Sequence, residues 1–331
     1  MKILLFSRRL LACFLLEFNV KIIKIMCFFC SEALMTENIF LKKIAAEKAN
    51  IEKYLKFYLD SLHIPGVLHE AMNYSLSAGG KRLRPFLSVA VCEMLGKPRE
   101  LIMPYACALE FVHTFSLIHD DLPALDNDDL RRGKPSCHKA FREDIAILAG
   151  DALNTDAFSL LFEFGEGNIK KAGKYFAKAV GGRGMTLGQI YDCTIPESER
   201  TVEKLDFINY YKTSELFIAA TAGAAAWLDA VDEEIKALEE YASNLGIAFQ
   251  IADDILDITS TTEKLGKKVG SDAALNKVTY PALIGIEGAQ KAVGERVRKA
   301  EAALEPFKGN EWCKVFTEFG VYIRDIMAKN N

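Results

Sequence analysis

Carboxylates crowd one short stretch of the sequence, IHDDLPALDNDDLRRGKP at residues 118–135. Its aspartates repel one another unless a cation or a solvated loop absorbs their charge. Pro123 disfavours helix at Leu122, so the chain can turn there and bring Asp120 and Asp126 toward one ion. Hard oxygen ligands of this kind suit Mg²⁺, which takes a few carboxylates together with water and phosphate oxygens.

A second acidic cluster, Asp253-Asp254-Ile-Leu-Asp257, lies near the end of another long apolar segment. Asp253 and Asp257 are four residues apart and would share a helix face, where like charges destabilise by about 0.2–0.5 kcal/mol. Either cluster alone could be a solvated acidic helix end, but two together favour a metal site between two walls. A calcium EF-hand is a poor alternative, because Leu130 stands where that loop needs Asp or Asn.

The segment GGKRLRP, residues 79–85, places two glycines and three cations before a proline that we expect at the first position of a helix. A helix N-terminus offers free N–H donors, so Lys81 and Arg84 could bind an anion such as phosphate there. Arg131 and Arg132 could grip phosphate oxygens bidentately or neutralise the neighbouring aspartates. Taken alone, GGKRLRP also fits an ordinary solvated turn.

Acidic groups on two walls and separate cationic groups suggest two phosphorylated substrates, one held through metal and one held directly. Phosphoryl transfer is one candidate, but the sequence contains no GxxxxGK[ST] loop and no kinase signature. A cavity between apolar helices indicates instead that the rest of the substrate is hydrophobic.

The elements that must position these groups are helices. Apolar residues recur at spacings of three and four from Met35 onward, and no run alternates as a half-buried strand would. We therefore expect an all-α protein, a single large helical bundle around a central substrate cavity. The expected helices cover residues 38–60, 66–77, 85–96, 100–120, 143–164, 167–181, 203–227, 232–259, 281–303 and 311–328. Segments 105–119 and 216–228 are apolar nearly all round, so they should lie inside a shell of helices or against a second subunit.

The 331 residues carry a net charge of only -4, which gives no general attraction for nucleic acid or anionic lipid. The eight cysteines include only one close pair, Cys27 and Cys30, and no second CxxC or His pair accompanies it. This favours reduced thiols in a cytoplasmic protein over a zinc site. Residues 1–34 lack the run of about 18 apolar residues that a membrane helix needs. They could be a signal or targeting segment, but we favour a dispensable or spurious extension before one catalytic domain, 35–331.

The motifs GGKRLRP, SLIHDDLPALDNDDLRRGKP, AILAGDAL, GQIYD, YKTSELF, FQIADDILD, LGKKVGSD and KVTYPAL follow in order from about residue 37 to the C-terminus. Together they resemble the polyprenyl (trans-isoprenyl diphosphate) synthases. The resemblance implies the isoprenoid synthase fold and a Mg²⁺-dependent head-to-tail condensation of isopentenyl diphosphate with dimethylallyl and then geranyl diphosphate. The spacing of four residues between Asp121 and Asp126 resembles that of the bacterial-type farnesyl diphosphate synthases, which implies a farnesyl product. The resemblance also implies a homodimer, which is common in the family.

The resemblance also implies a role for each motif residue. Three Mg²⁺ ions, or Mn²⁺ in their place, would be bound by Asp120, Asp126 and Asp253, with Asp121, Asp254 and Asp257 in support. The allylic diphosphate would contact Arg131, Lys212 and Lys267, with Lys277 as a further candidate cation. The isopentenyl diphosphate would contact Lys81, Arg84, His113 and Arg132. The polar side chains near the reacting carbons would be Thr213, Gln250, Gln189 and Asp192. Without the resemblance, the lone lysines would be interpreted as surface residues and His113 as a core residue. We interpret His119 as a structural residue.

Product length depends on Phe115 and Ser116, which match the family positions that line the floor of the chain pocket. A bulky aromatic residue there stops chain growth early, because overpacking a rigid cavity costs about 1–3 kcal/mol. This favours a C15 product and leaves C10 and C20 products, from a geranyl or geranylgeranyl diphosphate synthase, as alternatives. A non-catalytic subunit would be expected to lack the aspartates or the basic loop, and this sequence has both. A terpene cyclase does not need an isopentenyl diphosphate site such as GGKRLRP.

Overall fold

The computed structural model describes residues 38–259 and 277–328. In the first part its helices are α2 (Ile39–Ser61), α3 (Gly66–Leu76), α4 (Leu83–Met94), η1 (Arg99–Leu101), α5 (Met103–Asp120), α6 (Cys137–Ala140), α7 (Glu143–Glu163) and α8 (Ile169–Val180). Then come α9 (Met185–Thr194), η2 (Glu197–Glu199), α10 (Val202–Asn209), η3 (Tyr210–Ser214), α11 (Glu215–Ile218), η4 (Ala219–Gly223), α12 (Ala224–Trp227) and α13 (Asp232–Thr259). The last are α16 (Tyr280–Ala303), η5 (Glu305–Phe307) and α17 (Glu311–Ala328).

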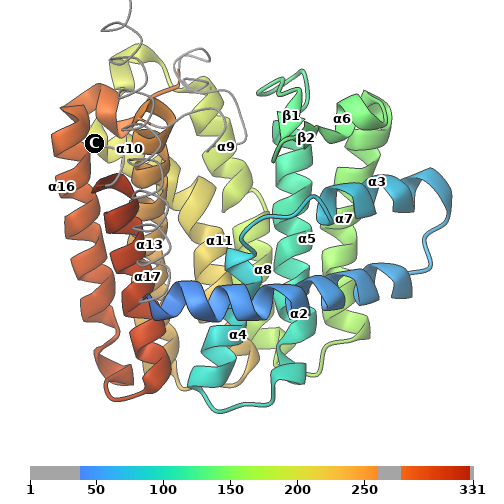
Figure 1. Ribbon diagram of the computed structural model, residues 1–331, viewed down its shortest axis with the longest axis horizontal. Coiled ribbons are helices and arrows are strands. Elements are labelled where there is room, and N and C mark those ends of the chain that lie inside the picture. The colour runs from blue at the N-terminus through green and yellow to red at the C-terminus, as the bar shows by residue number, and fades with distance from the viewer. Residues whose placement is uncertain (1–37, 260–276, 329–331) are drawn as a thin grey trace, which may run out of the picture.

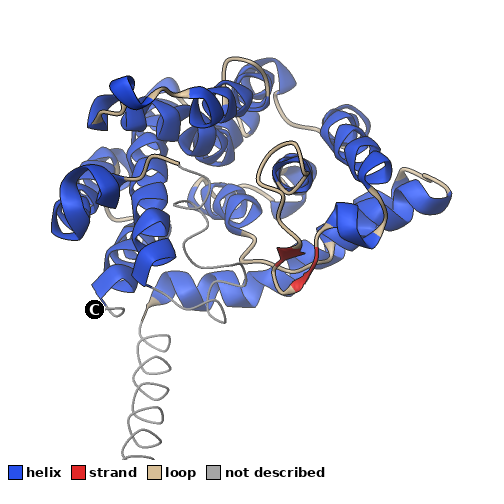
Figure 2. Ribbon diagram, turned by 90° about the horizontal axis from the view of Figure 1, so that it is seen from above, coloured by secondary structure: helices blue, strands red, loops and turns tan. Residues whose placement is uncertain are grey.

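Most of the long helices run side by side along one direction, and α2 crosses them at the front of the bundle (Figure 1). Seen from above, the upright helices are nearly end-on (Figure 2). The strands of the described chain, β1 (Leu130–Arg131) and β2 (Lys134–Pro135), form a short antiparallel hairpin. The prediction of an all-α bundle is confirmed.

Helix α5 forms the interior of the bundle and packs against α4 and α7. Pro104 suits its first turn, where a missing N–H breaks no helical hydrogen bond. Its residues 103–112 are all buried, as the apolar composition of segment 105–119 predicts. By length and composition alone, the stretches Arg99–Asp120 and Glu143–Glu163 could cross a membrane, but 72% of the first stretch's apolar window is buried within the protein. For α5, burial among other helices accounts for the apolar composition.

The expected single helix over residues 203–227 is interrupted twice. Turns η3 and η4 are π-helical, and the ordinary helical segments α10, α11 and α12 flank them. The Tyr105 hydroxyl donates to the Ala219 carbonyl at 2.9 Å, and the Ser88 hydroxyl donates to the Ala220 carbonyl at 2.9 Å. Residues 216–228 are buried, so these bonds satisfy carbonyls that water cannot reach.

Other boundaries differ from the expectations in informative ways. Helix α4 begins at Leu83, so Pro85 is its third residue and not its first. Helix α9 was not expected, because glycines precede it and Gly188 interrupts its sequence pattern. Gly285 kinks α16 with φ of 74°. The expectations for residues 1–34 and for Lys267 lie outside the described residues.

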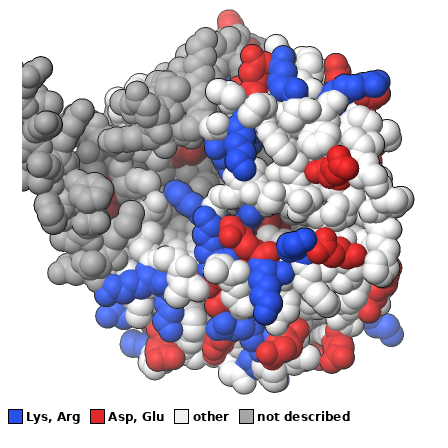
Figure 3. Space-filling view, turned by 45° about the vertical axis from the view of Figure 1, so that its right-hand side comes forward, with Lys and Arg blue, Asp and Glu red and all other residues white. Residues whose placement is uncertain are grey.

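Acidic and basic side chains are interspersed on the face of the molecule shown in Figure 3. This mixture accords with the small net charge of -4.

Candidate active site

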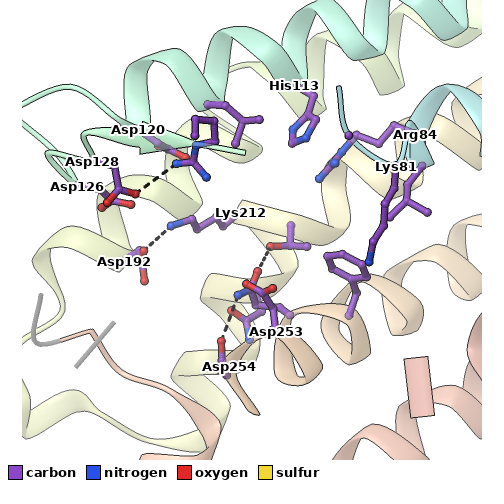
Figure 4. A pocket seen from close by; sticks show the side chains of 18 of the residues that line it. Lys81, Arg84, His113, Asp120, Asp126, Asp128, Asp192, Lys212, Asp253 and Asp254 are labelled. Atoms are coloured by element: carbon purple, nitrogen blue, oxygen red, sulfur yellow. Dashed lines mark hydrogen bonds and ion pairs between the residues drawn. The ribbon is translucent and has the colours of Figure 1, made fainter. Parts of the chain in front are cut away.

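A polar cavity of about 490 Å³ lies at the ends of α4, α5 and η3 and beside α13. It is lined by predicted residues from distant parts of the sequence: Lys81, Arg84, His113, Asp120, Asp126, Arg131, Arg132, Lys212, Thr213, Gln250, Asp253, Asp254 and Lys277. In Figure 4, Asp120, Asp126 and Asp128 lie on one side, Lys81, Arg84 and His113 on another, and Lys212 between them. The structure thus brings both acidic clusters and the basic loop to one space.

The first acidic wall is formed where α5 ends. The chain turns after Asp120, and the Asp126 N–H donates to the Asp120 carbonyl at 2.9 Å. The predicted turn at Pro123 is therefore confirmed, and it brings the two aspartates to the same wall. The Lys277 ammonium donates to both carboxylate oxygens of Asp126, at 2.8 and 3.0 Å.

Asp121 is paired with Arg131. Its side chain is buried and accepts hydrogen bonds from Arg131 Nε at 3.0 and 3.2 Å and from the terminal nitrogen Nη2. Asp121 therefore lies outside the wall of the polar cavity, whereas Arg131 reaches that wall. Arg131 therefore neutralises Asp121, as one of the two predicted roles requires, and its guanidinium also borders the cavity.

The second acidic wall is one face of α13. Asp253 borders the polar cavity, while Asp257 is buried and lies outside its wall. The Asp254 carboxylate accepts from Gln250 Nε2 at 3.1 Å and from the Tyr280 backbone N–H at 3.2 Å. These bonds orient Asp254 beside Asp253.

Basic groups occupy the side of the cavity formed by the 79–85 loop. Arg132 donates to the Gly79 carbonyl, and a Cβ on Gly80 would lie 2.6 Å from the Arg132 Cζ. Gly80 also has φ of 118°, so this close approach requires glycine. The Lys81 ammonium donates to the Tyr322 hydroxyl at 3.1 Å. The loop therefore holds Lys81 and Arg132 on the same side of the cavity.

Arg82, the middle cation of GGKRLRP, is mostly a structural anchor. Its guanidinium is buried and donates to Glu110 Oε1 at 2.7 Å and to the Leu76 carbonyl at 2.5 Å. These bonds fix the start of α4, where Arg82 itself has φ of 54°. The neighbouring Lys81 and Arg84 remain directed at the cavity (Figure 4).

The electrostatics of this basic side favour an anion. Burial lowers the pKa of Arg84 to about 10 against the opposing effect of Glu110, and the nearby Arg132 lowers it further. Burial also lowers the pKa of His113 well below 6.5, and the surrounding arginines act in the same direction. His113 is therefore neutral near pH 7, and an incoming anion would relieve repulsion among the arginines.

The acidic side favours a cation by the same reasoning. Burial raises the pKa of Asp120, and the nearby Asp126 carboxylate raises it further against the opposing effect of Lys212. Although burial works against its charge, Asp192 and Asp120 raise the pKa of Lys212, whose ammonium lies 2.5 Å from Asp192 Oδ2. Because the pKa of Asp120 is raised, a divalent cation bound there would compete with a proton for the carboxylate.

The donor set fits Mg²⁺. Asp120, Asp126 and Asp253 supply carboxylate oxygens from two walls of the polar cavity. Among residues 38–259 and 277–328, no group of three His, Cys, Asp or Glu residues converges on one metal position. An ion here would complete its coordination with water and substrate oxygens, which is the usual arrangement for Mg²⁺.

An apolar cavity of about 430 Å³ adjoins the polar one. The two share the wall residues Arg84, His113, Leu117, Asp120, Lys212 and Thr213. Phe115 and Ser116 line the apolar cavity on the α5 side, and Gln189 and Ile190 line it on the α9 side. Phe115 packs edge to face against His119, with ring centroids 5.4 Å apart. A substrate with a charged head and a hydrophobic tail fits this pair of cavities.

Sequence reasoning missed four polar residues in the wall of the polar cavity, Glu110, Asp128, Asn209 and Thr279. Glu110 is a lone acid on an apolar helix, a signal that could have been read. Asn209 is 3% exposed, and its Nδ2 has no hydrogen-bond partner in the described part of the chain. Nothing in the sequence distinguishes Asn209 from a surface asparagine.

Comparisons with known proteins agree with this geometry. The family model described as polyprenyl synthetase matches residues 65–308. The chain is 44% identical to a farnesyl diphosphate synthase of Geobacillus stearothermophilus over 263 residues, covering 78% of this chain and 89% of the relative. It is also 44% identical to geranylgeranyl pyrophosphate synthase 7, chloroplastic, of Arabidopsis thaliana over 253 residues, covering 75% and 73%.

A solved structure has the same fold. It is a geranyltransferase of Helicobacter pylori complexed with magnesium and isoprenyl diphosphate, with a TM-score of 0.74 and 31% identity. The match covers 88% of this chain and 98% of that one. From the family match, these relatives and the shared cavity architecture, the chain belongs to the polyprenyl synthetase family and is a prenyltransferase.

Proposed function

We propose that the chain condenses isopentenyl diphosphate with dimethylallyl diphosphate and then with geranyl diphosphate, and that it releases farnesyl diphosphate. The observation that carries this proposal is the continuity of the two cavities. The polar cavity has two acidic walls and a separate basic side, and the apolar cavity beyond it is lined by Phe115. Such a space suits two diphosphates and one growing hydrocarbon chain.

The allylic diphosphate would be held by Mg²⁺ on Asp120, Asp126 and Asp253. We propose three ions, and the Helicobacter pylori relative was solved with magnesium. Bound Mg²⁺ would supply positive charge that stabilises the leaving diphosphate. Lys212 and Arg131, which also line the polar cavity, would add positive charge near this diphosphate. Such preorganised cations stabilise the developing charge more than they stabilise the intact substrate.

The isopentenyl diphosphate would lie on the basic side, against Lys81, Arg84, His113 and Arg132. Breaking the allylic C1–O bond sends its electron pair to the departing pyrophosphate and leaves an allylic cation. The double bond of isopentenyl diphosphate then forms the new C–C bond with that cation, and the pyrophosphate takes the proton that is lost. Thr213 and Gln250 border this region and are joined by a hydrogen bond, and no nucleophilic side chain is required.

A second candidate product is geranylgeranyl diphosphate, because the Arabidopsis thaliana relative is named for it. The diphosphate sites would be the same, so the choice depends on the depth of the apolar cavity. Phe115 favours the shorter, farnesyl chain because its ring occupies the α5 side of that cavity.

We also propose that the protein acts in the cytoplasm as a homodimer. Helix α7 carries exposed apolar side chains, including Leu148 at 56% and Phe162 at 72% exposure. A second copy that covered this face would remove the apolar surface from water, which favours association. Light scattering on the eluted protein would give the mass of one or two chains.

Steady-state kinetics on two variants test the division into two diphosphate sites. Lys81→Gln should raise KM for isopentenyl diphosphate by about tenfold and leave KM for geranyl diphosphate unchanged. Asp253→Asn should instead raise the Mg²⁺ concentration that is needed for half of the maximal rate. Lys170→Gln, on the exposed face of α8, is the matched lysine control. Equal effects of Lys81→Gln on both substrates would refute the division.

A further inference from the structure

Lys212 and Thr213 are neighbours in the sequence, and both border the polar cavity. Adjacent residues of a regular α-helix point about 100° apart, so one of them would normally face elsewhere. Both lie in the π-helical turn η3, whose wider winding changes the direction of its side chains. Helices α9 and α13 both pack against this turn.

Helix α9 contacts the turn through a glycine. A Cβ on Gly188 would lie 2.5 Å from Cα and 2.7 Å from Cβ of Lys212, so only a residue without a side chain allows this approach. One helical turn further on, Asp192 holds the Lys212 ammonium at 2.5 Å. Gly188 and Asp192 therefore lie on the same face of α9 and contact the backbone and the charged end of one lysine.

Helix α13 repeats this arrangement on the other residues of the turn. A Cβ on Gly246 would lie 2.6 Å from Cα and 2.8 Å from Cβ of Ser214. One helical turn further on, Gln250 Oε1 accepts from the Thr213 hydroxyl at 2.9 Å. Gln250 Nε2 in turn donates to Asp254 at 3.1 Å, so the turn is connected to the second acidic wall.

We propose that Gly188 and Gly246 are positioning residues of the active site. Their bare Cα positions let α9 and α13 dock on η3, and Asp192 and Gln250 then fix the directions of Lys212 and Thr213. The inference rests on the proposed function, because it assigns Lys212 to the allylic diphosphate and Thr213 to the reacting carbons. Neither glycine touches the substrate.

Gly188→Ala tests the inference directly. To restore ordinary contact the Lys212 Cα must move from 2.5 Å to at least 3.4 Å from the new methyl group. A misplacement of about 1 Å lowers the rate on the order of 100-fold, so kcat/KM for geranyl diphosphate should fall by that factor. KM for isopentenyl diphosphate should not change. A merely structural role would reduce the amount of folded enzyme and would not separate the two substrates.

Two other glycines serve as matched controls. A Cβ on Gly173 of α8 or Gly294 of α16 would come no closer than 3.9 and 3.7 Å to its neighbours. Gly173→Ala and Gly294→Ala should therefore keep wild-type kinetics and an equal or higher Tm. Gly246→Ala should lower kcat/KM as Gly188→Ala does, through displacement of Ser214 and Thr213.

Crystal structures of the variants provide a readout that does not depend on activity. Gly188→Ala should break the Lys212–Asp192 contact, and Gly246→Ala should break the Thr213–Gln250 hydrogen bond. Intact contacts in both variants, or wild-type kinetics, would overturn the inference, as would loss of cooperative unfolding in Gly188→Ala. If the wild-type chain forms no prenyl diphosphate, the proposed function fails, while these structures still decide whether the glycines position the turn.

Discussion

Phe115 stands where the hydrocarbon chain would end. Its ring borders the apolar cavity and packs edge to face against His119, which lines the same cavity and whose Nε2 lies 3.1 Å from the Ile147 carbonyl of α7. This packing matters, because a floor residue limits chain growth only if it cannot turn aside. Product length is thus a property of a packed cluster and not of one ring alone.

Replacing Phe115 with alanine should lengthen the product by at least one isoprene unit. The substitution removes the ring from the α5 side of the cavity, and further condensation then meets less steric opposition. Chromatography of the dephosphorylated alcohols measures the shift from C15 toward C20. Phe57→Ala, which removes a ring that is 55% exposed on α2, should keep the wild-type product length. An unchanged C15 product from Phe115→Ala would place the floor elsewhere.

His113 should act as a neutral hydrogen-bonding group, so His113→Gln should retain kcat/KM within about fivefold, the cost of one altered hydrogen bond. Burial lowers the pKa of His113 well below 6.5, so the unfolded chain binds a proton there before the folded chain does. Stability is therefore lost as pH falls below about 6.5. Between pH 7 and pH 5 the wild-type Tm should fall further than that of the variant. If the Tm of the wild type and the Tm of His113→Gln fell equally between pH 7 and pH 5, His113 would not be buried as a neutral group.

At the scale of elements, the decisive feature is the interrupted helix from Val202 to Trp227. Its first π-helical turn, η3, contains Lys212 and Thr213, which border the cavity, and hydroxyl groups from α4 and α5 satisfy carbonyls at the second turn, η4. The bundle therefore supports the site through side-chain hydrogen bonds as well as through apolar packing.

Tyr105→Phe should lower the free energy of unfolding by about 1–3 kcal/mol, because the buried Ala219 carbonyl loses its partner. Tyr105 is fully buried, so water cannot replace the hydroxyl. Urea denaturation at pH 7 measures the change. Tyr74→Phe removes a comparable bond to the Pro135 carbonyl at an exposed position and should have a smaller effect. Equal losses in the two variants would show that burial of the carbonyl is not what matters.

The sequence allowed most helices to be predicted, since continuous periodic segments such as 143–164 coincide with a helix of the structure, here α7 (Glu143–Glu163). Prediction failed where tertiary contacts override local pattern. The π-helical turns depend on hydroxyls from distant helices, and α9 contains Gly188, whose purpose is visible only against Lys212. Likewise, the aspartate motif predicted a turn, but not that Asp121 faces Arg131 while Asp126 faces the cavity.

At the scale of the whole molecule, the first described residue, Asn38, contacts the last described helix, α17. Asn38 caps α2 by accepting from the Leu41 N–H at 3.0 Å, and its Nδ2 donates to Glu318 Oε2 of α17 at 2.9 Å. The cap and its contact with α17 lie after residue 35. A chain that begins at Met35 retains every group that takes part in them.

A chain shortened to begin at Met35 should fold and turn over like the full-length chain, with stability changed by no more than about 0.5 kcal/mol. Adding Asn38→Ala to the short chain should lower its stability by about 1 kcal/mol, because the cap of α2 is lost. Urea denaturation and the rate of farnesyl diphosphate formation measure both changes. A large loss of activity in the short chain would assign residues 1–34 a role in catalysis.

The most direct test of the central claim is product analysis of the wild-type protein. The purified chain is incubated with Mg²⁺, isopentenyl diphosphate and dimethylallyl diphosphate, and the dephosphorylated alcohols are resolved by length. We predict a dominant farnesol peak that disappears when EDTA removes the metal. A dominant geranylgeraniol peak would contradict the role of Phe115, and no prenyl alcohol from folded, Mg²⁺-supplied protein would contradict the proposed condensation itself.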